Sequence, residues 1–225
     1  MEANSFDHVA LWVEDRERLA AWLLDGLGLH EISRGDDFTL LGADAREGKL
    51  TLFDADGPRR PGVLARTVLR VHDLEAAASA LGAGAHRNGN GELAVTAPEG
   101  LEIGLVEARD GGPDYDLDHV VLRLPDPHAT ASALEELGFV REGTSLRVGN
   151  RRLLLEEGGA PDGPPLLNHL ALLVDSAEGV RRTAESRGLE IDKVVDAENT
   201  LAVFVRGPDG IVVEYVEHKP GFALV

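Results

Sequence analysis

Four apolar segments of similar pattern recur along the chain, and each leads into an amphipathic stretch. They are FDHVALWVED from Phe6, LARTVLRVHD from Leu64, LDHVVLRLPD from Leu117 and LLNHLALLVD from Leu166. After each segment the apolar positions take helical spacing, and short runs of alternating apolar and polar residues follow, which are typical of strands. The pattern predicts an α+β fold in which one βαβββ module is repeated four times.

A longer repeat is superimposed on the four modules. Asp7-His8-Val9 matches Asp118-His119-Val120, and PEGLEIGLVE in the first half matches PDGIVVEYVE in the second. Stretches rich in Gly and Pro separate the modules. We therefore predict two tandem halves, residues 1–110 and residues 115–225, each of which pairs its own two modules.

Three residues on apolar strands are candidate metal ligands. Alternation places Glu214 on one face with Val212 and Val216, and a carboxylate in apolar surroundings needs a partner. His119 and His169 lie at equivalent places near the start of the third and fourth modules. If those modules pair, both imidazoles and the carboxylate meet in one concave surface. Two His and one carboxylate are the facial arrangement of non-haem Fe(II), and Mn(II), Zn(II) or Ni(II) also suit it. Any one of these histidines taken alone is more often a hydrogen-bonded core residue.

Composition narrows the choice of partner and compartment. The formal net charge is −18, which repels phosphate backbones and anionic lipid, so we expect neither nucleic acid nor a membrane as partner. The chain has no cysteine, so any metal must be held by nitrogen and oxygen. No secretion signal or membrane-spanning run is visible at the start or elsewhere, so we expect a cytoplasmic protein that acts on a small molecule.

Several of these motifs together resemble the vicinal oxygen chelate superfamily. They are the strand-opening histidines in DHVVL and NHLALLV, the helix-ending LGF at 137–139 and the closing GPDGIVVEYVE from Gly207. That superfamily includes glyoxalase I, bleomycin-resistance proteins and extradiol ring-cleaving dioxygenases. The resemblance is strongest to two-domain type I extradiol dioxygenases. It implies four modules paired into two tandem glyoxalase-like half-barrel domains, with a divalent metal, preferably Fe(II), in the C-terminal one.

The first half looks degenerate in this frame. At the three places equivalent to the predicted ligands it has His8, Arg66 and Gly104. Arg66 is protonated at any relevant pH and cannot bind a metal, so we expect an ion pair between Arg66 and Glu102 to fill this region. His8 is then interpreted as a core histidine left over from duplication, and the first half as support without metal.

Some residues near the predicted site depart from the dioxygenase pattern. Phe204 stands where the resemblance implies a tyrosine, and no histidine occupies the place of the second acid/base group, so the catalytic residue stays unassigned. Phe204 and His218 are candidate substrate contacts, and the tail from Lys219 is a candidate cover. Tyr215 alternates with Glu214 and should pack beneath a helix.

The function we expect is that of a metal-dependent oxidoreductase resembling extradiol dioxygenases and acting on a small catechol-type substrate. A glyoxalase-like lyase or isomerase is the nearest alternative. A metal-free binding protein of the resistance type is the alternative outside enzymes. Edge strands would permit a homodimer, although no motif demands one.

Overall fold

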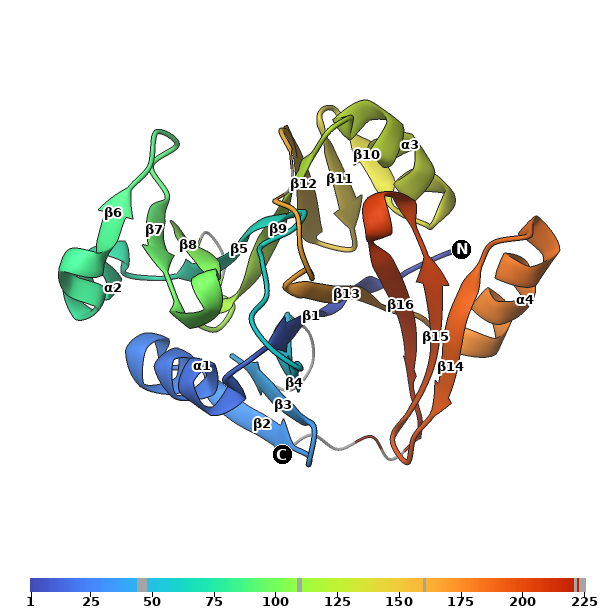
Figure 1. Ribbon diagram of the computed structural model, residues 1–225, viewed down its shortest axis with the longest axis horizontal. Helices are drawn as coiled ribbons and strands as arrows, with labels where there is room; N and C mark the ends of the chain where they lie inside the picture. The colour runs from blue at the N-terminus through green and yellow to red at the C-terminus, as the bar shows by residue number, and fades with distance from the viewer. Residues whose placement is uncertain (44–47, 109–110, 160, 221, 223–225) are drawn as a thin grey trace.

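The computed structural model describes residues 1–43, 48–108, 111–159, 161–220 and 222. Four modules follow one another, each with one strand, one helix and three further strands (Figure 1). The first has β1 (Ser5–Val13), α1 (Arg16–Trp22) with a π-helical continuation η1 (Leu23–Leu27), β2 (His30–Arg34), β3 (Phe38–Gly42) and β4 (Lys49–Asp54). The second has β5 (Leu64–Val71), α2 (Leu74–Leu81), η2 (Gly82–Gly84), β6 (Ala85–Arg87), β7 (Leu93–Thr96), η3 (Pro98–Gly100) and β8 (Glu102–Glu107). The third has β9 (Asp116–Leu124), α3 (Pro127–Glu136), β10 (Val140–Glu142), β11 (Ser145–Val148) and β12 (Arg151–Glu157). The fourth has β13 (Leu167–Leu173), α4 (Ala177–Arg187), β14 (Ile191–Asp196), β15 (Thr200–Arg206), η4 (Pro208–Gly210) and β16 (Val212–His218). The prediction of four βαβββ modules is confirmed.

Each α-helix begins directly after a polar capping residue that ends the preceding apolar segment. The side chains of Asp15, Asp73, Asp126 and Ser176 each accept a hydrogen bond from a backbone N–H in the first helical turn. Such caps satisfy donors that a helix start leaves without a partner, which fixes where each helix begins. None of the helices in the described residues is long and apolar enough to cross a lipid bilayer.

The modules pair in an order that differs from the predicted one. The first sheet runs β14-β15-β16-β13-β1-β4-β3-β2, and the second runs β10-β11-β12-β9-β5-β8-β7-β6. Module one therefore pairs with module four through antiparallel β1 and β13, and module two with module three through β5 and β9. The predicted boundary between residues 1–110 and 115–225 is wrong as a division into sheets, because each sheet takes one module from each half.

Two connecting segments cross between the sheets side by side. Residues 55–63 lead from the first sheet to the second, and residues 158–166 lead back. The backbone N–H of Arg60 donates to Pro164 at 2.9 Å, and that of Leu166 donates to the Arg60 carbonyl at 2.6 Å. These bonds hold the outgoing and returning chain together where the first and last modules must meet.

The two faces of each sheet have different surroundings. On β4, Leu50 and Leu52 are fully buried in the apolar core with Leu19 and other residues of the first helix. That core is continuous between the two sheets. The alternating residues of β4 face the other way, toward a concave surface that the curved first sheet forms. We call this surface the first cup, and its counterpart on the second sheet the second cup.

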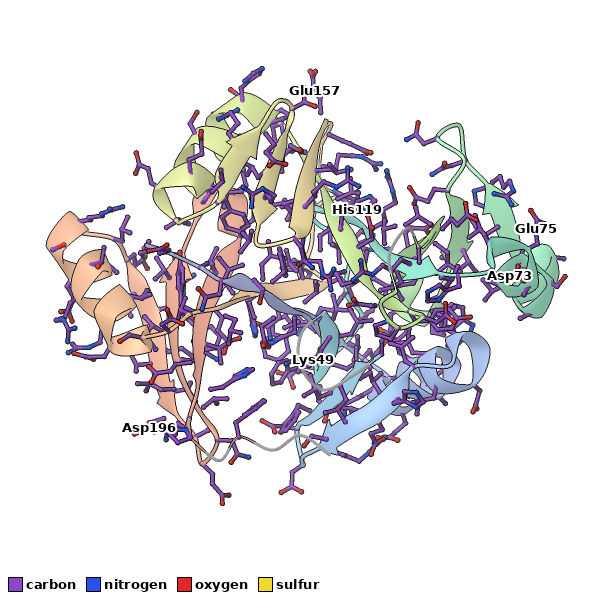
Figure 2. The ribbon with its side chains drawn as sticks, turned by 180° about the vertical axis from the view of Figure 1, so that it is seen from behind. Lys49, Asp73, Glu75, His119, Glu157 and Asp196 are labelled. Atoms are coloured by element: carbon purple, nitrogen blue, oxygen red, sulfur yellow. The ribbon has the colours of Figure 1, made fainter. Side chains whose placement is uncertain are left out.

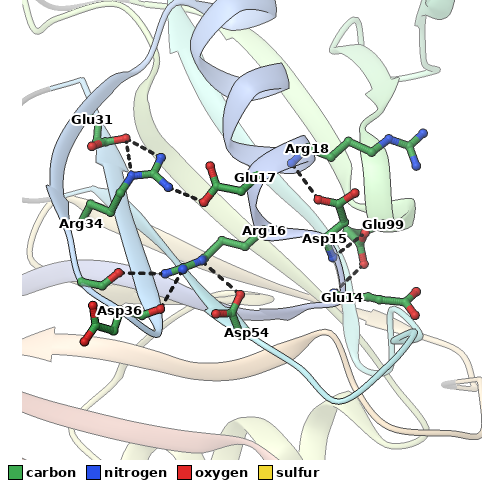
Figure 3. A network of polar contacts seen from close by, with 11 residues as sticks. Glu14, Asp15, Arg16, Glu17, Arg18, Glu31, Arg34, Asp36, Asp54 and Glu99 are labelled. Atoms are coloured by element: carbon green, nitrogen blue, oxygen red, sulfur yellow. Dashed lines mark hydrogen bonds and ion pairs between the residues drawn. The ribbon is translucent and has the colours of Figure 1, made fainter.

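A polar network joins the first module to the second outside the cups (Figure 3). Glu99, beside β8, accepts hydrogen bonds from the backbone N–H groups of Glu14 at 3.0 Å and Asp15 at 3.3 Å. Arg16 pairs with Asp54 at 3.1 Å across the start of α1. Since Glu14 and Asp15 lead from β1 into α1, these contacts fix the end of the strand that carries the site described next.

Candidate metal centre

Three side chains from three adjacent strands meet in the first cup. They are His8 on β1, His169 on β13 and Glu214 on β16. The Nε2 atoms of the two histidines lie 3.1 Å apart, and Oε2 of Glu214 lies 3.2 Å from His8 Nε2 and 2.7 Å from His169 Nε2. His169 and Glu214 are buried, and His8 is nearly so.

This spacing fits one metal ion. Donor atoms about 2.1 Å from an ion and at right angles to one another lie about 3.0 Å apart, which agrees with the three observed separations. Two imidazole nitrogens and one carboxylate oxygen on one side of an ion leave its other side open to a substrate. The chemistry and the spacing of the donor set therefore both fit a divalent transition metal.

The other nitrogen of each imidazole has its own partner. Nδ1 of His8 lies 2.7 Å from Asp7 Oδ1, and Nδ1 of His169 lies 3.0 Å from Asn168 Oδ1. A proton held on Nδ1 leaves the lone pair on Nε2, which points into the cup. The residue before each histidine thus orients the ring as a ligand.

Asp7 is itself held by two further side chains, those of Lys49 and His218. Its Oδ2 lies 3.0 Å from Lys49 Nζ and 3.0 Å from His218 Nε2. Asp7 and Lys49 are almost completely buried. Burial opposes the charge on Asp7, but hydrogen bonds from His218 and His8 and the charge of Lys49 hold the pKa of Asp7 well below its usual range. The carboxylate behind His8 is therefore ionised and fixed.

The protein part of the site carries a proton that a metal ion would displace. Burial opposes a charge on His8, but the hydrogen bonds to Asp7 and Glu214 outweigh it and raise the pKa of His8 to about 9. Burial also opposes the charge on Glu214, but its hydrogen bonds with His169 and His8 hold the pKa of Glu214 below its usual value. Burial lowers the pKa of His169. Binding of a metal ion here would release the proton from His8.

Aromatic side chains line the cup around His169. The Phe204 ring meets the His169 ring edge-on at 5.1 Å between centroids, and the Phe53 ring lies 6.1 Å from it. Trp12 extends this wall, 5.7 Å from Phe53. Phe204 lies directly opposite Glu214 in the strand register, so the structure places this predicted contact beside the ligands. Two cations lie over these rings: Lys193 Nζ is 4.4 Å from the centroid of the Phe204 ring, and the Arg59 guanidinium is 5.8 Å from that of Trp12.

His119 does not join the other predicted ligands. It lies on β9 in the second sheet, whereas His169 and Glu214 lie in the first (Figure 2). Its Nδ1 contacts Asp118 at 2.6 Å, as His8 contacts Asp7. The prediction that His119 shares a site with His169 and Glu214 is wrong, because module three pairs with module two. His8 lies beside His169 and Glu214 in its place, and the interpretation of His8 as a core histidine left over from duplication stays a prediction.

The second cup contains an ion pair where the first has ligands. Arg66 Nε lies 3.0 Å from Glu92 Oε1, and its Nη2 lies 3.0 Å from Glu156 Oε1. A Cβ on Gly104 would fall 2.0 Å from Glu92 Oε1, so the Glu92 carboxylate fills the space beside this glycine. Glu102 instead accepts from the Thr96 hydroxyl at 2.6 Å. The predicted ion pair of Arg66 exists, but its partners are Glu92 and Glu156, not Glu102.

A polar cavity of about 590 Å³ opens over the second sheet. Charged residues of both signs line it, among them Arg70, Arg87, Glu92, Asp118 and Arg152. This lining contrasts with the aromatic wall of the first cup.

Two further predictions concern β16 and its end. Tyr215 is fully buried and its hydroxyl donates to the Leu137 carbonyl at the end of α3, as expected for a residue packed beneath a helix.

His218 contacts Asp7, so it lies behind His8, and the Phe222 ring stacks on the His218 ring with 3.7 Å between centroids. Of the tail predicted as a cover, residues 221 and 223–225 lie outside the described residues.

The sequence contained a signal for His8 that was given too little weight. Asp or Asn precedes histidine near the start of three modules, at His8, His119 and His169. Each pair forms the same Nδ1 contact in the structure. The motif marked three histidines as possible ligands, whereas the candidate site contains two of them, His8 and His169.

Comparison with known proteins gives one family match and several structures of similar fold. Residues 5–105 match the family described as the Glyoxalase/Bleomycin resistance protein/Dioxygenase superfamily. No curated protein matches the chain. Among solved structures, a "putative dioxygenase" from Bacillus subtilis subsp. subtilis str. 168 is 20% identical, with a TM-score of 0.77 over 99% of this chain and 87% of that one. Glyoxalase I from Zea mays is 16% identical, with a TM-score of 0.68 over 95% of this chain and 92% of that one. The cppA protein from Streptococcus pneumoniae TIGR4 is 16% identical, with a TM-score of 0.68 over 96% of this chain and 100% of that one.

At these identities the structural matches establish the fold of the chain. The family match shows in addition that the sequence of the first two modules is related to that superfamily. Residues 5–105 therefore match the superfamily that the sequence resembles, and the chain as a whole has the fold of glyoxalase I and of the putative dioxygenase.

Proposed function

We propose that this chain is a metal-dependent enzyme in which His8, His169 and Glu214 hold a divalent metal ion. The observation that carries the proposal is the mutual spacing of their donor atoms, between 2.7 and 3.2 Å. A buried carboxylate between two imidazoles, with the far nitrogen of each ring fixed by a neighbour, is what a preformed site requires. Fe(II) is the preferred ion for this donor set, and Mn(II), Ni(II) and Zn(II) are compatible with it.

We further propose an oxidoreductase of the extradiol ring-cleaving type, acting on a small catechol-type substrate. When bound, an Fe(II) ion supplies Lewis-acid activation of substrate oxygens and exchanges electrons with O2. The protein supplies the shape: Phe53 and Phe204 flank His169 and suit a planar ring. The same rings keep water away from the open side of the site, which strengthens electrostatic interactions within it.

A glyoxalase-like lyase or isomerase is the second candidate. Phe204 favours it, because the side chain opposite Glu214 in the strand register is a plain ring with no hydroxyl to donate a proton. Chemistry that only polarises a chelated substrate needs fewer proton donors than ring cleavage does. A metal-free binding protein is the third candidate, and the close spacing of the His8, His169 and Glu214 donor atoms argues against it.

Metal analysis tests the proposal. Protein purified without oxygen should contain close to one equivalent of metal, and His169→Ala and Glu214→Ala should each lose it. His86→Ala is the control, because His86 is an exposed histidine of the second sheet. Wild-type protein that retains no metal, and whose melting temperature does not change when Fe(II), Mn(II), Ni(II) or Zn(II) is added, would leave only the metal-free binding protein.

Oxygen uptake separates the two enzymatic candidates. Metal-loaded protein is screened with catechols under air and under argon, with Glu214→Ala as the blank. Catechol-dependent O2 consumption supports the dioxygenase. Turnover of a substrate that is equal under both gases supports the lyase or isomerase.

A further inference from the structure

The first cup has a local two-fold symmetry that relates its two histidines. In the antiparallel pair of β1 and β13, Ala10 lies opposite His169 and His8 lies opposite Ala171. A two-fold axis between the strands therefore exchanges the two histidines. Any residue beside one of them has a counterpart beside the other.

The counterpart of Glu214 is Thr51. β16 runs parallel to β13 with Glu214 beside Ala171, and β4 runs parallel to β1 with Thr51 beside Ala10. The four symmetric places around the site thus hold two histidines, one glutamate and one threonine. Three of the four contribute to the donor cluster, and Thr51 completes the set.

The Thr51 side chain faces the cup and lacks a partner there. Its neighbours Leu50 and Leu52 point to the apolar core, and Phe53, two residues on, lies 6.1 Å from the His169 ring. Thr51 is only 5% exposed, and its hydroxyl has no hydrogen-bond partner among the described residues. A buried hydroxyl without a partner lowers stability, and because the Thr51 hydroxyl faces the cup, a ligand bound there would supply the missing hydrogen bond.

The length of the threonine side chain suggests what that ligand is. A glutamate reaches its oxygen two bonds further from Cβ than a threonine does, a difference of about the size of one oxygen atom. An ion held by His8, His169 and Glu214 is therefore too far from the Thr51 hydroxyl for direct binding. The intervening space suits an oxygen atom of a small molecule.

We propose that Thr51 is a positioning residue, whose hydroxyl forms a hydrogen bond with an oxygen atom of the substrate on the open side of the site. The choice of threonine over a longer acidic residue also keeps the site at three protein ligands. This inference rests on the proposed metal centre, and it adds a residue that orients the substrate without touching the ion.

The test uses Co(II) as the metal and acetohydroxamate as a small chelator with two adjacent oxygens. Co(II) affinity, the visible absorption of the Co(II) protein and its acetohydroxamate affinity are measured for each variant. Thr51→Val should leave Co(II) affinity within about twofold and weaken acetohydroxamate binding by about three- to tenfold, the effect of one hydrogen bond. Thr51→Ser should restore chelator binding.

Thr39→Val is the matched control. Thr39 lies on the neighbouring strand β3 opposite Leu52, so it faces away from the cup, and its buried hydroxyl also has no partner among the described residues. It should change neither Co(II) nor acetohydroxamate affinity. Thr51→Glu should instead tighten Co(II) binding about tenfold through a fourth ligand and change the Co(II) absorption.

The outcomes separate this inference from the proposed function. Wild-type protein that does not bind Co(II) overturns both. Wild-type protein that binds Co(II), with Thr51→Val and Thr39→Val equal to it in acetohydroxamate affinity, leaves the metal centre intact and overturns the role of Thr51. Chelator binding lost in Thr51→Val and restored in Thr51→Ser supports it even if Thr51→Glu does not fold.

Discussion

The two cups of this molecule have the same arrangement of strands, but the negative charge of a buried carboxylate is balanced by different groups in each. Each buries a carboxylate on an apolar sheet, and such a group requires a cation. In the second cup Arg66 supplies that cation to Glu92 from within the chain. In the first cup Glu214 faces two imidazoles, a set that suits a metal ion from solution. The two cups differ at two equivalent places: Arg66 stands where the first cup has His169, and Gly104 stands where it has Glu214, with the Glu92 carboxylate in the space beside this glycine.

The largest predicted contrast between the cups concerns their strand-opening histidines. His8→Ala should reduce metal affinity by at least about 100-fold, because it removes one of three ligands. His119→Ala, at the equivalent place of the second cup, should leave metal affinity unchanged. Isothermal titration with Co(II) measures both. Equal losses in the two variants would contradict the assignment of the ligands to the first cup alone.

Removal of Arg66, the cation of the second cup, should lower the stability of the folded protein. Arg66→Met leaves the carboxylate of Glu92, which is 4% exposed, without its partner and should lower the free energy of unfolding by about 3–5 kcal/mol. Arg152→Met is the control, because its half-exposed side chain pairs with Asp118 at 3.3 Å and should cost less than about 1 kcal/mol. Urea unfolding measures both variants. A loss in Arg66→Met no larger than in Arg152→Met would show that the second cup does not need this cation.

The residue that supports each histidine gives a finer comparison. Asp7→Asn should weaken metal binding by about 10- to 100-fold, since it removes the charged acceptor that orients His8. Asp118→Asn changes the same contact behind His119 and should have no effect on metal affinity. Competition with a chromogenic chelator resolves this range. If both variants bind metal like the wild type, Asp7 does not act through His8.

The smallest predicted effect lies at the contact between the fourth and third modules. Tyr215→Phe should lower the free energy of unfolding by about 1–2 kcal/mol, because the buried Leu137 carbonyl loses its donor. It should leave metal affinity unchanged, since Tyr215 faces away from Glu214. Tyr115→Phe is the control, because its hydroxyl makes no hydrogen bond to a described residue. Thermal unfolding monitored by circular dichroism measures both, and a metal affinity that changes in Tyr215→Phe would argue against the separation of the two faces.

The local features of the fold could be predicted from the sequence for identifiable reasons. Period-two alternation assigned Glu214 to the cup face and Tyr215 to the core face, and the structure agrees on both. Helical spacing of the apolar positions after each opening segment predicted one helix in each module, and the structure has a helix in each of these places. These signals are short-range: each depends on residues a few positions apart.

The pairing of modules could not be read in the same way. The opening strands β1, β5, β9 and β13 are all apolar, and any two of them could bury a similar area when they pair. The connecting segments 55–63, 108–115 and 158–166 are of nearly equal length, so chain length did not separate the alternatives. His8 and His119 were therefore equivalent as candidates.

The sequence by itself determined that the chain has four βαβββ modules, that any metal it bound would have nitrogen and oxygen ligands, and that His169 and Glu214 belong to one face of the last module. Only the tertiary structure decided that module one, and not module three, lies beside that face. The physical reason is that a strand's own pattern specifies which side chains point to the cup. The choice of its neighbour depends on contacts between segments distant in the chain, such as the bonds between Arg60 and residues 164–166 that bring the first and last modules together.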